Sequence, residues 1–292
     1  MLKKESLSII VMQSILVYIS FYKFFESPNL FLFDNWYDGL KNYFTWYGYI
    51  SYNSSDSFFN YNLMNYPYGE FVFFTDNSPL FAIFVKLIKS NFVLNNATAI
   101  HNLFFILAII LSSFLLYKIL QVIIKNSLLR VVTSICLPWI LPQFFRIDNH
   151  FNLSMSVFFF WNLLSLIRIY SFKSNKNKYL WFVSLFLSIF ISSFFHLYYT
   201  LIFGIFSISF NLFVLLIERN KQSFKMTSVS MFVTISSIIV VYIILYLIDD
   251  YSSLRLEKAN GYDWLSWKLR IENLFMRNEW FVVPFLFNYE KT

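Results

Sequence analysis

The sequence predicts an all-α integral membrane protein. Its composition, the length of its apolar segments and the position of its charges all favour this class. Of the 292 residues, 58% are hydrophobic and only 13% are charged, and the mean hydropathy is +0.57. Soluble domains carry roughly a quarter charged residues, and disorder requires low hydrophobicity with high net charge. The composition therefore excludes both a soluble globular enzyme and a disordered chain.

Apolar segments long enough to cross a bilayer recur along the chain. A helical span needs about 20 mostly apolar residues to cover roughly 30 Å of hydrocarbon. No small-residue cleavage site follows the first segment, so we interpret it as an anchor and not as a signal peptide. We predict seven spans, at residues 7–25, 100–124, 128–145, 151–170, 179–195, 197–217 and 226–248.

The fifth and sixth spans are inferred from the flanks of one long apolar run. Residues 179–217 contain no charged side chain. As a single helix they would reach about 58 Å at 1.5 Å per residue, nearly twice the hydrocarbon thickness. Both flanks are basic, and basic flanks favour the cytoplasmic side. Two crossings with a turn near His196 satisfy both conditions.

The distribution of charge predicts the orientation. Loops on the N-terminal side of the membrane would hold only Glu5 and Glu218 of the 16 acidic residues. Because basic loops favour the cytoplasm, we expect a cytoplasmic N-terminus. We also expect a multi-span membrane domain over residues 1–248 and an extracytoplasmic amphipathic tail over 249–292. The same loops would hold 12 of the 23 basic residues, namely Lys3, Lys4, Lys118, Lys125, Arg130, Arg168, Lys173, Lys176, Lys178, Arg219, Lys221 and Lys225.

The outer loop of residues 26–99 is expected to have structure of its own, because unstructured loops of this length are uncommon and usually functional. Residues 33–49 place Trp and Tyr at spacings of three and four, which is typical of an amphipathic helix in the headgroup layer. Residues 66–69 predict a turn with proline at its second position. A second interfacial helix is predicted over residues 79–90, with Ser78 as N-cap and proline as its first residue.

Two carboxylates in this loop are the first candidates for chemistry. Asp34 and Asp38 are four residues apart, so on a helix they would share one face. Such a pair provides either a general base or half of a site for Mg²⁺ or Mn²⁺. The alternative is a solvated acidic helix start, since acids favour the first turn of a helix.

Basic and imidazole side chains at the outer turns are candidates for binding a lipid phosphate. The guanidinium of Arg146 matches phosphate oxygens, and His150 adds a donor. An Arg146–Asp148 pair at a solvated loop is the alternative. His196 is the one strongly polar ring in a run of 39 apolar residues, and ionisable groups at membrane depth tend to be functional, although a turn at the interface also accommodates histidine.

Three further residues of the outer loop complete the candidate substrate-binding set: Lys41, Glu70 and Asp76. For Asp76 the alternative is the capping of a turn, and for Glu70 it is a solvated turn position. The chain has a single cysteine, Cys136, which excludes an internal disulfide and a cysteine-type metal site. Its basic residues are scattered over short loops, so nucleic acid is not an expected partner.

Four stretches of the sequence and the order of its predicted elements carry a family resemblance. The stretches are residues 33–45 (FDNWYDGLKNYFT), 66–70 (YPYGE), 74–80 (FTDNSPL) and 142–154 (PQFFRIDNHFNLS). The predicted order is a first span, a long outer loop opening on an acidic motif, two interfacial helices and many hydrophobic spans. Together they resemble the GT-C class of integral membrane glycosyltransferases, which use polyprenyl-phosphate sugars, and uncharacterised bacterial membrane proteins of that type.

The resemblance implies a GT-C-like fold and assigns roles to the candidates. In that class an acid in the first outer loop commonly serves as base or metal ligand, and this role maps onto Asp38 first and Asp34 second. Phosphate binding by basic side chains at outer turns maps onto Arg146, His150 and His196. No cofactor is implied beyond an optional Mg²⁺ or Mn²⁺.

The implied activity is inverting transfer of a sugar from a polyprenyl-phosphate donor to a glycan, lipid or protein acceptor. It would take place on the extracytoplasmic face of a bacterial plasma membrane, in the making of cell-envelope polysaccharide. Members of the class usually have further spans and often a soluble outer domain, so the resemblance makes a truncated chain the expectation. Two alternatives stay open: a transporter or flippase for lipid-linked glycans, and a non-catalytic assembly subunit.

Overall fold

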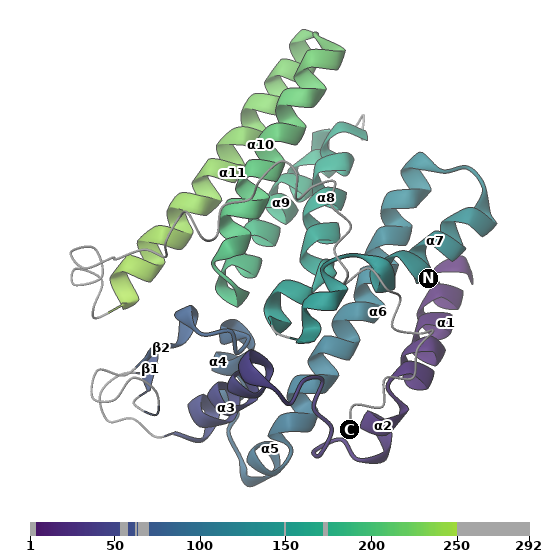
Figure 1. Ribbon diagram of the computed structural model, residues 1–292. Coiled ribbons are helices and arrows are strands. Elements are labelled where there is room, and N and C mark those ends of the chain that lie inside the picture. The colour runs from purple at the N-terminus through teal and green to yellow at the C-terminus, as the bar shows by residue number, and fades with distance from the viewer. Residues whose placement is uncertain are drawn as a thin grey trace, which may run out of the picture. The chain divides into compact units, whose positions relative to one another are not determined.

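The computed structural model describes residues 4–52, 58–61, 63, 70–148, 150–171 and 175–249. They belong to one compact unit, Met1–Asp249. The predicted turn at residues 66–69 and the predicted tail after Asp249 lie outside the described residues. Within that unit the backbone is almost entirely helical, with one two-stranded sheet (Figure 1).

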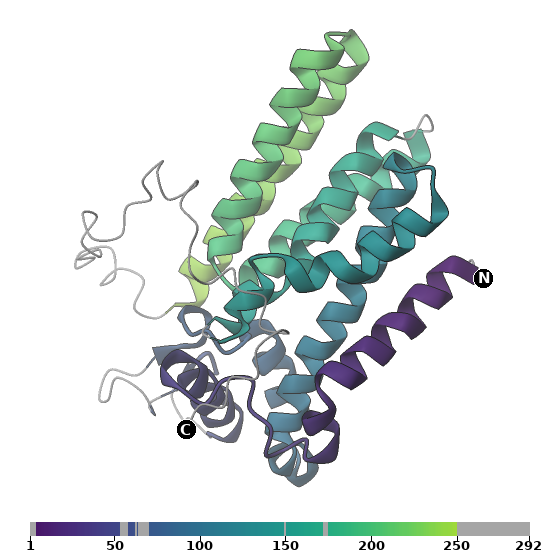
Figure 2. The same cartoon turned by 45° about the vertical axis from the view of Figure 1, so that its right-hand side comes forward.

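Four helices of the described part are long and apolar enough to cross a membrane. They confirm the prediction of an all-α membrane protein. Three follow one another in the C-terminal half of the unit, with short connections between them, and the views of Figures 1 and 2 agree that the last two run side by side. The four are α6 (Ala97–Ile123), α9 (Asn175–Phe195), α10 (Tyr198–Glu218) and α11 (Lys221–Ile248). The division of residues 179–217 into two helices at His196 is thus correct.

Three other predicted spans are helical but shorter than predicted. The first breaks at Phe21 into α1 (Lys4–Ser20) and α2 (Tyr22–Glu26). The third, α7 (Ser127–Ile140), ends before Pro142, because the residue preceding a proline is disfavoured in the helical region. The fourth, α8 (Ser156–Ser171), begins five residues later than predicted. Two 3₁₀ turns fill the gap between these last helices: η2 (Phe144–Asp148) and η3 (Phe151–Ser154).

The described parts of the predicted outer loop, residues 26–99, are structured, as predicted. Its elements are α3 (Tyr37–Ser51), the paired strands β1 (Asn60–Tyr61) and β2 (Glu70–Phe71), the 3₁₀ turn η1 (Val72–Phe74), α4 (Pro79–Leu87) and α5 (Asn91–Asn95). The predicted amphipathic helix therefore begins at residue 37 and not at 33. One face of α3, with Tyr43, Trp46 and Tyr49, is buried, and the opposite face exposes Leu40, Phe44 and Tyr47.

The start of α4 is predicted correctly, but not the role of its cap. Ser78 stands at the N-cap position and proline follows it, yet its hydroxyl makes no cap hydrogen bond. It donates instead to Oδ1 of Asn152 at 2.6 Å. The helix also ends three residues early, at Leu87. Lys86 Nζ of α4 lies 4.0 Å from the ring centre of Tyr49, and Lys89, just after the helix, donates to the carbonyl of Ser51 at 2.7 Å.

Buried polar side chains join the C-terminal helices of the unit. The Asn162 amide of α8 donates to Ser188 of α9 at 3.2 Å, and Ser207 of α10 donates to Oδ1 of Asn162 at 3.2 Å. The hydroxyl of Tyr170 contacts Asn211 at 2.5 Å and Thr227 of α11 at 3.0 Å. Interhelical hydrogen bonds of this kind are typical of helix packing in membranes.

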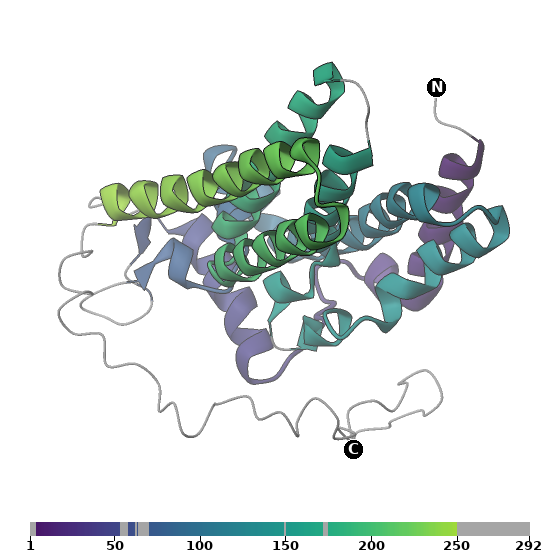
Figure 3. The ribbon, with the colours of Figure 1, turned by 90° about the horizontal axis from the view of Figure 1, so that it is seen from above.

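The turns between the helices lie at two ends of the helical bundle. His196 connects α9 to α10 at one end, where the outer-loop elements also gather (Figures 1 and 2). At the other end lie Arg219 and Lys221, where α10 connects to α11. There the guanidinium of Arg130 of α7 also forms an ion pair with the carboxylate of Glu5 of α1, with a nitrogen–oxygen distance of 3.2 Å. We call these the His196 end and the basic end. Seen from above, α10 and α11 remain adjacent along their length (Figure 3).

Candidate functional site

Three side chains from distant parts of the sequence meet at the His196 end. Asp76 lies between η1 and α4, His150 between η2 and η3, and His196 between α9 and α10. Nδ1 of His150 is 2.9 Å from Oδ2 of Asp76, and Nε2 of His196 is 3.9 Å from Oδ1 of the same carboxylate. The Asp76 side chain is only 12% exposed, so one nearly buried carboxylate faces two imidazoles.

Hydrogen bonds assign different roles to the two imidazoles. The backbone N–H of Tyr198 donates to Nδ1 of His196 at 3.2 Å, so the neutral ring carries its proton on Nε2, toward Asp76. Burial lowers the pKa of His196 and favours this neutral form. The hydrogen bond to Asp76 raises the pKa of His150 above its ordinary value. His150 thus donates from Nδ1 and leaves Nε2 available for proton transfer.

One asparagine joins the three segments that supply these side chains. Asn152 accepts the Ser78 hydroxyl at Oδ1 and the Tyr199 hydroxyl at its carbonyl oxygen, both at 2.6 Å. Ser78 is two residues after the aspartate, Asn152 two residues after the first histidine, and Tyr199 three residues after the second. Ser78 has a φ of 55°, a left-handed conformation that is unfavourable for a residue with a Cβ. We call this group the Asn152 junction.

The three side chains line a cavity of about 380 Å³, here called the Asp76 cavity. This volume lies within the range of about 300–1,000 Å³ for small-molecule sites. Five of the eight sequence-predicted site residues are among its lining, and the rest of the wall is mainly apolar or aromatic. The lining residues are Lys41, Thr45, Glu70, Phe73, Phe74, Thr75, Asp76, His150, His196, Leu197 and Tyr198.

Lys41 provides a cation at the cavity wall. Its Nζ lies 3.0 Å from Oδ1 of Asp38, and the two side chains are 49% and 47% exposed. Exposed ion pairs contribute roughly 0–1 kcal/mol, so Lys41 can exchange this partner for a ligand at little expense. Asp38 is not part of the cavity lining, and neither is Arg146. Both still act on His150 through charge, since Asp38 raises and Arg146 lowers its pKa.

Asp34 has a local structural contact. It precedes α3, so the expectation that Asp34 and Asp38 share one helix face is wrong. Oδ1 of Asp34 accepts the N–H of Trp36 at 3.0 Å, which holds the chain in a turn before the helix. A Cβ on Gly39 would lie 2.4 Å from Oδ2 of Asp34, so this close approach requires glycine. In the described part of the chain no group of three or more His, Cys, Asp or Glu is arranged to hold a metal.

Some site features had no clear sequence signal. Asn152 and Tyr199 were not predicted to take part, because a lone asparagine and a tyrosine in an apolar run are common in membrane helices. The exposed rings of Phe74 and Tyr198 at the cavity were also missed. The Asp76–His150 contact joins residues 74 positions apart, and no local pattern reports such a pairing.

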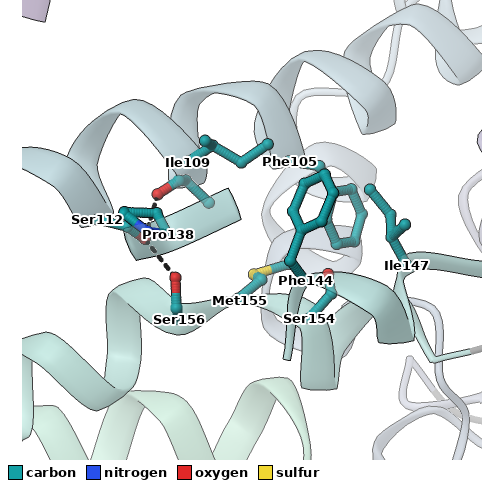
Figure 4. Close-up of a pocket in the computed structure, with 10 residues that line it drawn as sticks. Phe105, Ile109, Ser112, Pro138, Phe144, Ile147, Ser154, Met155 and Ser156 are labelled. Atoms are coloured by element: carbon teal, nitrogen blue, oxygen red, sulfur yellow. Dashed lines mark hydrogen bonds between the residues drawn. The ribbon is translucent and has the colours of Figure 1, made fainter. Parts of the chain in front are cut away.

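A second cavity between α6, α7 and α8 differs in kind (Figure 4). It is lined mainly by apolar groups, including Phe105 and Met155, and Ser156 donates to Ser112 at 3.0 Å along its edge. Its volume is about 10 Å³, which suffices for at most one water molecule. It is a packing space and not a substrate site.

Comparison with known proteins gives a family but no described activity. No curated protein and no solved structure matches this chain. The family described as Domain of unknown function (DUF6311) matches residues 13–280, which include the entire Asp76 cavity. Because this match covers most of the sequence, the chain belongs to the family described as Domain of unknown function (DUF6311).

Proposed function

We propose that this chain is a membrane glycosyltransferase that moves a sugar from a polyprenyl-phosphate donor to an acceptor hydroxyl in the Asp76 cavity. One observation carries the proposal. The hydrogen-bonded pair of Asp76 and His150 opens on the same cavity as Lys41, at one end of an apolar helical bundle. This arrangement supports a role for His150 as base and for Lys41 as the cation that binds a lipid-linked phosphate.

His150 is the proposed general base, oriented by Asp76. The acceptor hydroxyl gives its proton to Nε2 of His150 while its oxygen forms a bond to the anomeric carbon of the sugar. The bond from that carbon to the phosphate oxygen breaks, and its electron pair leaves with the polyprenyl phosphate. Attack opposite the leaving group inverts the anomeric centre. Asp76 stabilises the imidazolium that forms, and positioned bases of this kind contribute roughly 10²–10⁴-fold to rate.

The leaving phosphate requires positive charge and hydrogen-bond donors. Lys41 supplies a cation at the cavity wall, and His196 supplies the Nε2–H that now faces Asp76. Arg146 is exposed and acts on His150 through charge, so it lies near enough to attract an anionic donor. Preorganised donors aimed at developing charge are often the largest single contribution to catalysis. An optional Mg²⁺ or Mn²⁺ belongs to the resemblance and has no role in these steps.

The finer topology is part of the same proposal: seven crossings, with the His196 end outside a bacterial plasma membrane. Helices α1, α7 and α8 have 17, 14 and 16 residues, or about 26, 21 and 24 Å at 1.5 Å per residue. The adjoining α2 and the two 3₁₀ turns extend them toward the hydrocarbon thickness. Basic segments favour the cytoplasm, which supports an inside location of the basic end and an outer location of the Asp76 cavity.

Transfer by the full-length chain in proteoliposomes tests this function. The donors are a panel of radiolabelled polyprenyl-phosphate hexoses and pentoses, and the readout is release of polyprenyl phosphate with a labelled product. His150→Gln should lower transfer by about 10²-fold or more. Lys41→Gln should raise the KM for the donor, whereas the matched control Lys125→Gln, an exposed lysine at the basic end, should change neither constant.

Three results would argue against the proposal. If His150→Gln transferred sugar at the wild-type rate, His150 would not be the general base. Movement of the lipid-linked sugar across the bilayer without any sugar transfer would indicate a flippase. Deletion of the protein could cause a defect of the cell envelope. If every variant of the cavity residues corrected that defect, the protein would be a non-catalytic assembly subunit.

A further inference from the structure

A second polar cavity lies at the basic end, far from the Asp76 cavity along the helices. It has a volume of about 200 Å³, and its lining comes from α8, α9, α10 and α11. This is below the range of about 300–1,000 Å³ for drug-sized ligands, so it suits one small polar group. Its lining residues are Tyr170, Lys178, Glu218, Asn220, Gln222, Ser223 and Met226.

Lys178 is the unusual member of this lining. It lies in the first turn of α9 and is only 4% exposed. Among the residues whose side chains are described, it has no ion-pair or hydrogen-bond partner. Lysine is almost never fully buried without a partner, because a buried charge is costly unless it is paired. Because Lys178 lines the polar cavity, an anionic group in that cavity would supply the partner of its ammonium.

The start of α11 adds to the attraction for an anion. This helix has 28 residues and begins at Lys221, and its N-cap Asn220 accepts the N–H of Ser223 at 2.8 Å. Helix N-termini favour anions through their free N–H groups and their dipole. Asn220, Gln222 and Ser223 all line the cavity, so the buried cation and the positive end of a helix dipole act on the same space.

The carboxylate of Glu218 indicates that the ligand carries a positive group in addition to a negative one. It ends α10, where a negative charge is unfavourable, and in the described structure its carboxylate contacts the Ser223 hydroxyl but no cation. The neighbouring Arg219 donates instead to the carbonyl of Leu216 at 2.9 Å. Lys178 and Glu218 line one cavity without forming an ion pair with each other. The site thus offers separate places for a negative and a positive group.

We propose that this cavity binds a phosphoethanolamine group, with the phosphate at Lys178 and the primary ammonium at Glu218. The group belongs to a bilayer lipid, because exposed apolar side chains continue from the cavity along the outer faces of α10 and α11. Leu216, Ile217 and Phe224 are 66%, 65% and 61% exposed there and can contact acyl chains. The cavity is a structural lipid site at the opposite end of the bundle from the Asp76 cavity, and it does not depend on the proposed glycosyl transfer.

Lipid binding to the full-length chain in detergent, followed by native mass spectrometry, tests this site. The probes are phosphatidylethanolamine, phosphatidylglycerol, soluble phosphoethanolamine and inorganic phosphate. The wild type should prefer phosphatidylethanolamine over the other probes. Lys178→Met should weaken that binding about tenfold, the effect of losing one charge-assisted hydrogen bond. Arg219→Gln, which removes a neighbouring exposed charge, should leave the preference unchanged.

Glu218→Gln is the second variant, and its exposed position protects the fold. It removes the partner of the ammonium, so the preference for phosphatidylethanolamine over phosphatidylglycerol should disappear while binding of the phosphate group remains. Unchanged phosphatidylethanolamine binding in both Lys178→Met and Glu218→Gln would overturn the proposal. Binding of soluble phosphoethanolamine as tight as that of the lipid would overturn the lipid source and assign the site to a soluble phosphomonoester.

Discussion

Nδ1 of His150 lies 2.9 Å from Oδ2 of Asp76, and this contact organises the His196 end of the molecule. A carboxylate at Nδ1 fixes the orientation of the ring and raises the pKa of His150. The second imidazole, His196, faces the other oxygen of the carboxylate at 3.9 Å, and burial lowers its pKa. One acid thus contacts two histidines whose pKa values are shifted in opposite directions, His150 upward and His196 downward.

Replacing Asp76 should change the pH dependence of transfer. The base is active when His150 is neutral, so the wild-type rate should rise with pH through a raised pKa of this residue. Asp76→Asn removes the largest cause of that increase, and the rising limb should move to lower pH while the maximal rate falls. A pH–rate profile of both proteins measures this. A limb that stays in place would show that another group titrates.

The same pair should contribute to stability in acid. Because the folded-state pKa of His150 is raised, the contribution is fully present below the pKa of the unfolded chain. It is lost as pH rises through the folded pKa. Asp76→Asn should therefore lower the melting temperature more at pH values below the ordinary histidine pKa than at alkaline pH. Thermal unfolding in detergent across that interval checks the sign, and an effect that is larger in alkali would contradict it.

Asp38 and Asp76 are competing candidates for the essential acid. The resemblance favours Asp38, but this residue pairs with Lys41 on an exposed surface and does not line the cavity. We expect Asp38→Asn to retain transfer within about fivefold, since exposed pairs contribute roughly 0–1 kcal/mol. Asp76→Asn should lose far more. Transfer assays on the two variants, made at equal expression, separate the candidates, and complete loss in Asp38→Asn alone would restore Asp38 as base.

Ser78 allows backbone strain and a hydrogen bond to be separated. Ser78→Ala loses the hydroxyl bond to Asn152 but keeps a Cβ at a φ of 55°. Ser78→Gly loses the same bond and removes the strain. Left-handed conformations cost non-glycine residues roughly 1–2 kcal/mol, so Ser78→Gly should be the more stable of the two by about 1 kcal/mol. Equal melting temperatures of the two variants would contradict this, because they would mean that the backbone around residue 78 leaves the strained conformation in Ser78→Ala.

Gly39 and Asp34 should behave as a coupled pair. A Cβ at Gly39 would lie 2.4 Å from the Asp34 carboxylate, so Gly39→Ala must displace that side chain and the turn that it holds. Overpacking of this kind costs roughly 1–3 kcal/mol. The double variant with Asp34→Ala should recover much of the loss, because the clash is then absent. Unfolding measurements on the full cycle reveal the coupling, and strictly additive losses would contradict it.

The sequence could predict features that depend on local composition. Apolar length identified all four long helices, and the uncharged run at residues 179–217 showed that it had to turn near His196. The proline before α4 marked the helix start correctly. Such features depend on hydrophobicity and on backbone sterics, which act over a few residues and leave a direct pattern in the chain.

Helix boundaries and side-chain contacts were harder to predict from the sequence. The helix of the predicted third span ends at Ile140 because Pro142 follows, and Asp34 lies before α3 and not on it. The prediction that Asp34 and Asp38 share one face therefore failed, while five of the eight candidates still line one cavity. Residue type was thus informative about which side chains gather at the His196 end, but spacing did not show which of them touch.

By itself the sequence determined an all-α membrane protein with its polar, ionisable candidates collected in the outer loop and at two turns. Only the tertiary structure selected Asp76 as the common partner of His150 and His196, placed Lys41 in the lining of the same cavity, and buried Lys178 at the opposite end. The physical reason is distance along the chain. Hydrophobic periodicity acts within one helix, whereas the contacts of Asp76 require η1, η2 and the α9–α10 turn to pack together through the Asn152 junction.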